Sequence, residues 1–294
     1  MSFILILLAS FFFTGIVIRV KSIAQGRKGP SLWQPMYDIW KLLHKGSVYS
    51  NVSSWIFKVA PTIYFATVIV AMLVVPVGLF GSVIGFSGDF IFFAYALALG
   101  KFFTIIGALD TASSFEGMGS AREALFSMLV EPAFFILIGS LGLLTGYTSF
   151  SDIFAAFHIT GEVSYAYAAI AAFVLLMICM IENSRMPVDD PKTHLELTMI
   201  HEVMVLDNSG VDMGLIHQAT NMKFALYTTL IAGLFIGNVE TWWMQTILFF
   251  GIQVISAMCV GLIESFMARY RMIHNAQFIL VLSSLALLIF FGIK

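Results

Sequence analysis

Long apolar stretches separated by polar segments dominate this chain. A helix needs about 20 apolar residues to cross a bilayer, and eight stretches meet that length. They lie at about residues 3–20, 55–80, 89–109, 121–147, 164–183, 223–238, 242–263 and 275–292. No repeat, low-complexity tract or linker divides them. The pattern therefore predicts an all-α integral membrane protein, a bundle of eight transmembrane helices that forms a single domain over residues 1–294.

Composition agrees with this pattern. Hydrophobic residues make up 60% of the 294 and charged residues 11%, whereas a soluble domain carries roughly 25% charged residues. The first stretch follows no basic residue and ends at no small-residue cleavage site, so we read it as a retained span rather than a signal peptide. The two cysteines, Cys179 and Cys259, lie alone in apolar runs. With no CxxC pair, we expect no metal or iron–sulfur cluster on this chain.

The basic residues indicate how the bundle is oriented. With eight spans, the loops that follow odd-numbered spans share one side. That side and its adjoining helix ends hold 13 of the 15 Lys and Arg residues, while Lys101 lies within the third span and Lys294 on the opposite side. The positive-inside rule then places these loops in the cytoplasm and both termini outside.

The first cytoplasmic loop contains an amphipathic segment. Its apolar side chains recur at helical spacing: Trp33, Met36, Tyr37, Trp40 and Leu43. Its charged side chains take the other face: Asp38, Lys41 and Lys45. This pattern predicts a helix lying in the membrane interface with its aromatic rings at headgroup depth. The alternative is that its apolar side forms the wall of a cavity beneath a soluble partner.

Residues 181–210, between the fifth and sixth spans, concentrate ionisable groups. These are Glu182, Asp189, Asp190, His194, Glu196, His201, Glu202 and Asp207. Such a cluster at a membrane boundary indicates proton transfer or docking of a soluble partner. A solvated acidic loop is the alternative, but the interspersed Leu195 and Leu197 favour a function. Asp190 before Pro191 predicts the start of a helix that runs towards Asp207.

Glu131 and Lys101 lie well inside their apolar spans. Glu131 precedes Pro132 near the middle of the fourth span, where proline removes a helical hydrogen bond. Its carboxyl group must be neutral, paired or hydrated in an internal cavity, and it is either a proton relay or a neutral acid capping the broken turn. Lys101 in the third span needs a partner, for which Glu131 is the candidate. That pair is either structural or part of a relay.

Further charged residues flank the spans. The run DTASSFEGMGSAREAL, which joins the third span to the start of the fourth, contains Asp110, Glu116, Arg122 and Glu123. In it, Gly117 and Gly119 permit close approach of another backbone, and Ser120 is predicted to cap the next helix. After Glu264 come Arg269 and Arg271, which either neutralise lipid headgroups or dock an acidic soluble subunit.

Motifs for self-contained catalysis are missing. The segment with Gly117 and Gly119 has no GxGxxG or Walker spacing for phosphate. His201-Glu202 lacks the second histidine of HExxH, which excludes a zinc protease. His194 and His201, seven residues apart, would need outside ligands to hold one metal.

Several motifs resemble the complex I subunit 1 family, the membrane-arm subunit that seats the peripheral arm. The matching residues in the first loop and second span are Gly26-Arg27-Lys28-Gly29-Pro30, Gln34-Pro35, Asp38, Lys41-Leu42-Leu43 and Ala60-Pro61. The run from Glu182 to Asp189 resembles the acidic third cytoplasmic loop of that family. The resemblance covers residues 15–275, and eight spans agree with it.

Details of the motifs favour one branch, the membrane-bound group 4 [NiFe] hydrogenases. Residues 110–132, with FEGMGSARE and the Glu131-Pro132 pair, resemble this branch, as do HLELTMIHEVMVLDNSG and Glu264 with Arg269. The branch includes formate hydrogenlyase, hydrogenase-4 and the energy-converting, ferredoxin-linked type. The quinone-reducing branch carries a different acidic run in the third loop, so a quinone pocket is not expected.

The resemblance implies a non-catalytic subunit of an oxidoreductase complex in the cytoplasmic membrane of a prokaryote. The hydrogenase large and small subunits and an iron–sulfur subunit would sit on the cytoplasmic loops and carry the [NiFe] centre and iron–sulfur clusters, with no cofactor on this chain. Antiporter-like membrane subunits that move H+ or Na+ would complete the complex within the lipid bilayer. No nucleic acid is expected as a partner.

We assign candidate roles on this basis. The proposed proton relay comprises Asp110, Glu123, Glu131, Glu182, Glu196, Glu202 and Lys101. The proposed partner-docking residues are Arg27, Lys28, Arg185, Asp189, Asp190, Arg269 and Arg271. Three alternatives remain: a subunit of NADH–quinone oxidoreductase that contributes to a quinone site, a stand-alone secondary transporter, and a purely structural anchor. The transporter class tends to show repeats and paired broken helices, which this sequence lacks.

Overall fold

Eight helices in the described part of the chain are long and apolar enough to cross a membrane, as the sequence predicts. The computed structural model describes residues 1–157, 162–190, 199–237, 239 and 241–293. The long helices are α1 (Ser2–Ala24), α3 (Trp55–Val74), α4 (Asp89–Asp110), α5 (Ser114–Thr145), α7 (Glu162–Glu182), α9 (Gly210–Ile236), α10 (Trp242–Phe266) and α11 (Met272–Ile293). Shorter helices are α2 (Gln34–Leu43), α6 (Phe150–Ala156) and α8 (His201–Met204). These residues contain no β-strand, so the all-α fold is confirmed.

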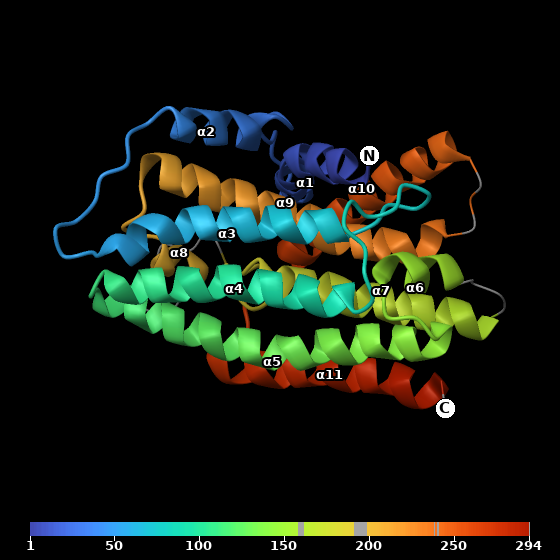
Figure 1. Ribbon diagram of the computed structural model, residues 1–294. Coiled ribbons are helices and arrows are strands. Elements are labelled where there is room, and N and C mark those ends of the chain that lie inside the picture. Colours follow the sequence, from blue (N-terminus) through green and yellow to red (C-terminus); the bar gives the residue numbers. More distant parts are fainter. Residues whose placement is uncertain (158–161, 191–198, 238, 240, 294) are drawn as a thin grey trace.

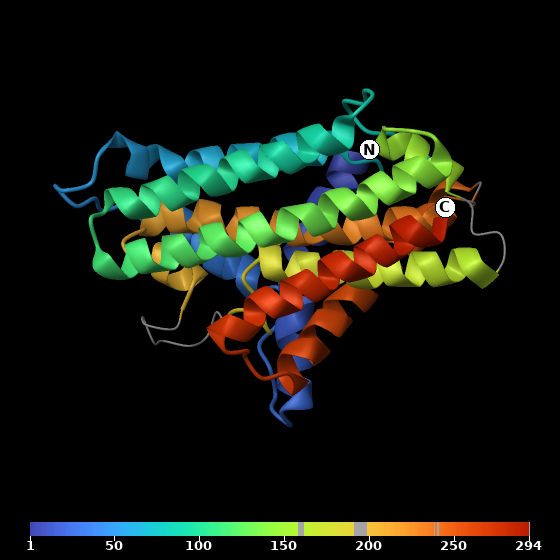
Figure 2. The same ribbon diagram turned by 90° about the horizontal axis from the view of Figure 1, so that it is seen from below.

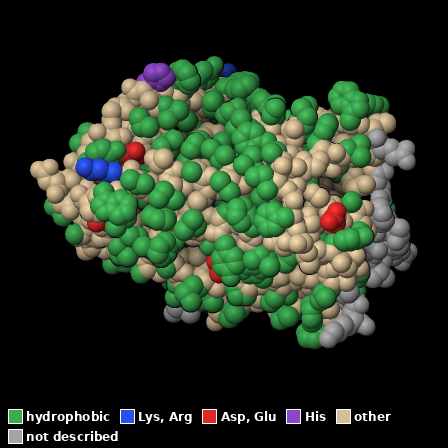
Figure 3. All heavy atoms as spheres, in the orientation of Figure 1, with side chains coloured by type: hydrophobic (Ala, Val, Ile, Leu, Met, Phe, Trp, Pro, Cys, Tyr) green, Lys and Arg blue, Asp and Glu red, His purple; other side chains and the backbone are tan. Residues whose placement is uncertain are grey.

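Helix α9 is the centre of the bundle. It packs against α1, α2, α3, α7 and α10, and 89% of its most apolar 18-residue stretch is buried. Around it, α3 lies beside α4 and α5 beside α11 (Figures 1 and 2). Helix α4 is the most peripheral of the eight, with 22% of its stretch buried. The face seen in Figure 3 is covered mainly by hydrophobic side chains, as a lipid-facing surface requires.

Three predicted span boundaries were wrong. Helix α3 ends at Val74 rather than near residue 80, because Val75 is extended and the residue before a proline, here Pro76, disfavours the helical conformation. Helix α5 begins at Ser114 and α9 at Gly210, well before the predicted 121 and 223. Both helices open with polar residues that hydropathy assigns to loops but that the bundle buries, such as Glu116 and Asp212.

Helix α5 runs unbroken through Pro132. The prediction that Ser120 caps this helix was wrong: Ser120 lies inside α5, and its hydroxyl donates to the carbonyl of Gly117 at 2.8 Å. The predicted close approach at Gly119 is confirmed, because a Cβ atom there would lie 2.9 Å from the carbonyl oxygen of Ile200. Glycine thus lets the segment around α8 lie directly on α5.

Helix α2 is the predicted amphipathic helix. Its aromatic side chains point outward, with Trp33, Tyr37 and Trp40 48%, 58% and 60% exposed. Its opposite side, including Asp38 and the buried Ile39, lines a cavity of about 360 Å³. One face of α2 thus walls a cavity, while contact of the aromatic face with lipid headgroups stays a prediction.

The prediction of a helix from Pro191 towards Asp207 was wrong for the described residues 199–207, where the only helix is α8, His201–Met204. The carboxylate of Asp189 accepts hydrogen bonds from the backbone N–H groups of Ile200 and His201 at 3.2 and 3.1 Å. This contact starts a new turn at His201. His194 and Glu196 lie outside the described residues.

Candidate functional site

Four charged side chains from four helices meet inside the bundle. Lys101 of α4 lies 3.0 Å from Glu123 of α5 and 2.9 Å from Glu182 of α7. Lys223 of α9 lies 2.9 Å from Glu182. None of these side chains is more than 11% exposed. We call this group the charge cluster; it holds two ammonium groups and two carboxylates and is neutral when all four are ionised.

Helix ends and neighbouring side chains position the cluster. Glu182 is the last residue of α7, and the Nζ of Lys223 also donates to its backbone carbonyl at 2.7 Å. A cation at this place satisfies a free carbonyl and the negative end of the helix dipole. The hydroxyl of Ser184 donates to Glu123 at 3.3 Å, which ties α5 to the start of the next loop.

The predicted partner of Lys101 was wrong. Glu131 makes no hydrogen bond or ion pair with any described residue, whereas Lys101 pairs with Glu123 and Glu182. Glu123 lies two turns nearer the start of α5 than Glu131, at the level where α7 ends with Glu182, and there the Lys101 ammonium meets both carboxylates. Sequence spacing could not show this, because it does not give the relative height of α4 and α5.

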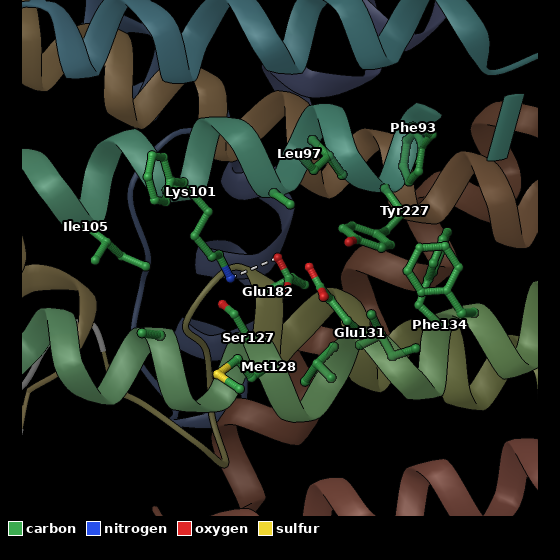
Figure 4. A pocket seen from close by; sticks show the side chains of 17 residues that line it. Phe93, Leu97, Lys101, Ile105, Ser127, Met128, Glu131, Phe134, Glu182 and Tyr227 are labelled. Atoms are coloured by element: carbon green, nitrogen blue, oxygen red, sulfur yellow. Dashed lines mark ion pairs between the residues drawn. The ribbon is translucent and has the colours of Figure 1, made fainter. Parts of the chain in front are cut away.

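Glu131 instead lines a cavity of about 200 Å³ that begins at the charge cluster. Lys101 and Glu182 of the charge cluster line this cavity beside Glu131, and we call it the relay cavity (Figure 4). Glu131 is exposed in the isolated chain although it lies midway along α5. The remaining polar lining comes from Ser127 and Tyr227, and most other lining residues are apolar.

Sequence reasoning missed two residues of this site, Lys223 and Tyr227. Lys223 is the first residue of the sixth predicted span and was counted with the basic residues of the cytoplasmic side, whereas it is 1% exposed and lies inside α9. Tyr227 follows it by four residues, and that spacing puts both on one helix face. The sequence signal that could have identified both residues is a lysine and a tyrosine four positions apart inside an apolar helix.

At the cluster end of the bundle, Glu264 joins two basic residues. Its side chain is 1% exposed and lies 3.2 Å from Lys21 and 3.3 Å from Arg185. The Arg185 guanidinium also lies 5.1 Å from the ring centre of Phe224, a cation–π contact. This group links α1, α9 and α10 to the loop after α7.

Asp189 anchors the loop between α7 and α9. Its carboxylate pairs with Arg269 at 3.1 Å and accepts the backbone N–H groups of Asp190, Ile200 and His201. Burial raises the pKa of the Asp189 carboxyl, an effect that these donors partly offset. The loop is therefore fastened to the segment that connects α10 and α11.

The remaining predicted residues are dispersed. Asp110 accepts the backbone N–H groups of Ser54 and Phe57 at 2.7 and 3.3 Å, so it caps α3 rather than joining the cluster. Glu202 lines the 360 Å³ cavity between α1, α2 and α9.

Of the predicted docking residues, three are exposed, namely Arg27, Lys28 and Arg271. Three others form ion pairs within the chain: Arg185, Asp189 and Arg269. The docking role stays a prediction.

The 360 Å³ cavity is the second polar site. It is lined by Asp38, Arg185, His201, Glu202 and His217, among others. Burial lowers the pKa of His201 to about 4, so this imidazole is neutral at pH 7. Among the described residues, no three His, Cys, Asp or Glu side chains converge as metal ligands would.

Known proteins share both the sequence and the fold. Formate hydrogenlyase subunit 4 of Escherichia coli (strain K12) is 28% identical over 272 residues, covering 88% of this chain and 86% of that protein. Hydrogenase-4 component C of the same strain is 28% identical over 233 residues, covering 79% and 73%. The NADH-ubiquinone oxidoreductase chain 1 of Triticum aestivum is 26% identical over 229 residues, covering 75% and 68%.

A solved structure confirms the architecture. The membrane-bound sulfane sulfur reductase, an archaeal respiratory membrane complex, contains a chain that aligns with a TM-score of 0.84 at 16% identity, covering 99% of this chain and 97% of that one. At this identity the likeness concerns the fold. The profile of the NADH dehydrogenase family matches residues 1–293. This multi-pass membrane chain therefore belongs to the NADH dehydrogenase family.

Proposed function

We propose that this chain is the membrane-anchoring and proton-coupling subunit of a membrane-bound [NiFe] hydrogenase complex. The proposal rests on the neutral charge cluster, which borders a cavity that also holds Glu131, a residue midway along α5 whose carboxyl group lies beside Glu182 (Figure 4). When a carboxylate of the cluster gains a proton, the net charge next to Glu131 changes.

The cluster geometry provides the coupling step. Protonation of Glu123 or Glu182 leaves the cluster with one excess positive charge. A nearby positive charge favours the ionised form of a carboxyl group, so proton uptake at the cluster promotes proton release from Glu131. Moving one charge against 100 mV costs about 2.3 kcal/mol. A swing of roughly two pKa units on one buried acid supplies this energy, since one unit corresponds to about 1.4 kcal/mol.

The partners follow from the same proposal. The hydrogenase large and small subunits and an iron–sulfur subunit sit on the loops that contain Arg27, Lys28 and Arg271, and they carry the [NiFe] centre and the clusters. Antiporter-like membrane subunits cover the peripheral α4–α5 face, where Glu131 is exposed in the isolated chain. We place the chain in the cytoplasmic membrane of a prokaryote with both termini outside. The similarity to two hydrogenase-type relatives over most of their length supports this branch.

A second candidate is a subunit of NADH–quinone oxidoreductase that contributes to a quinone site. It is favoured by the 360 Å³ cavity between α1, α2 and α9, which combines apolar walls with His201 and Arg185. Sensitivity of the purified complex to ubiquinone analogues distinguishes it, because a hydrogenase without a quinone site is insensitive to them.

Replacement of Glu131 by Gln tests the coupling role. The variant complex, reconstituted in vesicles, is expected to evolve H2 with a soluble artificial electron donor at the normal rate but to lose H2-coupled ion pumping. Asp152→Asn is the matched control, because Asp152 is exposed on α6, away from the relay cavity. Pumping that persists at the control level in Glu131→Gln would remove Glu131 from the path.

A further inference from the structure

Tyr227 is a buried residue whose hydroxyl group opens into the relay cavity. Tyr227 is 5% exposed, and its hydroxyl makes no hydrogen bond with any described residue. Figure 4 shows the ring beside Glu131, with the hydroxyl end directed towards the carboxyl groups of Glu131 and Glu182. Buried tyrosine hydroxyls normally have a hydrogen-bond partner, so a partner inside the relay cavity is expected.

The neighbours of Tyr227 fix the direction of its hydroxyl. Phe93 and Phe134 contact the ring edge to face, with centroids 6.1 and 6.5 Å away. The same helix face carries Lys223 one turn earlier, so α9 positions both an ammonium of the charge cluster and this hydroxyl. The two phenylalanine rings lie 5.8 Å apart and pack on the same side of the Tyr227 ring, and the hydroxyl end points away from them, along the cavity towards Glu131 and Glu182 (Figure 4).

The relay cavity has room and polar groups for water. Its volume of about 200 Å³ far exceeds the roughly 10–15 Å³ that one water needs, and a buried water requires two to four polar partners. Lys101, Glu131, Glu182 and Tyr227 provide them. Ser127 lies on α5 one turn before Glu131 and also lines the cavity. Its hydroxyl oxygen is buried and has no hydrogen-bond partner among the described residues.

We propose that Tyr227 is a positioning residue that orients water between Glu182 and Glu131; this inference rests on the proposed proton-coupling function. In the transfer step, water accepts the proton of a protonated Glu182 carboxyl and gives one of its own protons to the Glu131 carboxylate. One O–H bond breaks and one forms at each stage, and Tyr227 keeps its proton. Its hydroxyl hydrogen-bonds to the water and holds it in line with the two carboxyl groups.

Tyr227→Phe tests this role in the intact complex in vesicles, because it removes the hydroxyl and keeps the ring packing. We expect ion pumping to slow about tenfold, as for loss of one hydrogen bond in a transition state. The ratio of pumping rates in H2O and D2O should rise, because proton transfer becomes rate-limiting. H2 evolution with the artificial donor and the amount of assembled complex should not change.

Tyr167→Phe is the matched control. It removes a hydroxyl that donates to the carbonyl of Gly292 at 2.6 Å, outside the relay cavity, and it should pump normally. Normal pumping and an unchanged isotope ratio in Tyr227→Phe would overturn the inference, and so would poor assembly with the isotope ratio unchanged. If Glu131→Gln abolishes pumping in the same assay, the proposed function stands without Tyr227; normal pumping in both variants overturns both.

Discussion

The ammonium group of Lys223 holds two parts of Glu182 at once. It donates to the backbone carbonyl of Glu182 at 2.7 Å and lies 2.9 Å from the carboxylate of the same residue. The end of α7 is thereby fixed to the centre of α9. Because Glu182 also binds Lys101, the position of one helix end determines the geometry of the whole charge cluster.

Charge balance in this cluster leads to a stability prediction. Lys101→Met leaves two buried carboxylates with one ammonium, and an uncompensated buried charge costs about 3–5 kcal/mol. The double variant Lys101→Met/Glu123→Gln restores neutrality, because Lys223 still pairs with Glu182. We expect the double variant to melt at a higher temperature than Lys101→Met alone, measured on the detergent-solubilised complex. Equal melting temperatures would show that neutrality does not govern the stability of this site.

The spans were predictable because their signal is local. Each needs only a run of apolar residues, and all eight are found. The start of α9 was misplaced because its first turns contain Gln218 and Asn221, which resemble loop residues. In the bundle, Asn221 accepts a hydrogen bond from Thr14 at 2.5 Å, and both amide side chains are buried. Partners from distant helices, which a single sequence does not reveal, make these positions helical and internal.

The site was predictable in its residue types but not in its pairing. Acids near the ends of spans identified Glu123 and Glu182, and an acid beside a proline identified Glu131. Which carboxylate meets Lys101 depends on how α4, α5 and α7 are shifted along one another, and this relationship arises only from packing. For the same reason, Asp110 was assigned to the relay as an acid near the end of a span, but in the structure it caps α3.

Close packing at Gly119 yields a second prediction. A Cβ atom at this position would overlap the side chain of Val203 and lie 2.9 Å from the carbonyl oxygen of Ile200. Gly119→Ala should therefore displace the α8 segment and destabilise the chain by about 1–3 kcal/mol, the usual cost of overpacking. Thermal denaturation of the solubilised complex measures the effect.

Gly139→Ala is the control on the same helix. Nothing lies within 4 Å of its added Cβ, so alanine should raise stability by about 0.5–1 kcal/mol through helix propensity. Destabilisation by both substitutions would mean that α5 tolerates no alanine at either site and would contradict the specific contact at Gly119.

The Asp189–Arg269 pair predicts a local change in the loop between α7 and α9. Arg269→Gln leaves the buried Asp189 carboxylate without its cation, which costs roughly 3 kcal/mol. Proteolysis between α7 and α9 should become faster while the spans stay intact. Arg271→Gln, at an exposed residue two positions away, should be cut at the wild-type rate. Equal resistance of both variants would show that the ion pair does not hold the loop.

His201 predicts the pH dependence of stability. Burial lowers its pKa to about 4, whereas an unfolded imidazole has a pKa of about 6.5. Between these values only the unfolded chain takes up a proton, so the contribution of His201 is complete above pH 6.5 and is lost as the pH falls towards 4. His201→Gln should remove on the order of 2–3 kcal/mol of the acid destabilisation. The drop in melting temperature from pH 7.5 to 4.5 should then be smaller than in the wild type, whereas exposed His44→Gln should match the wild type. A drop in His201→Gln as large as that of the wild type would mean that carboxyl groups alone cause the loss of stability in acid.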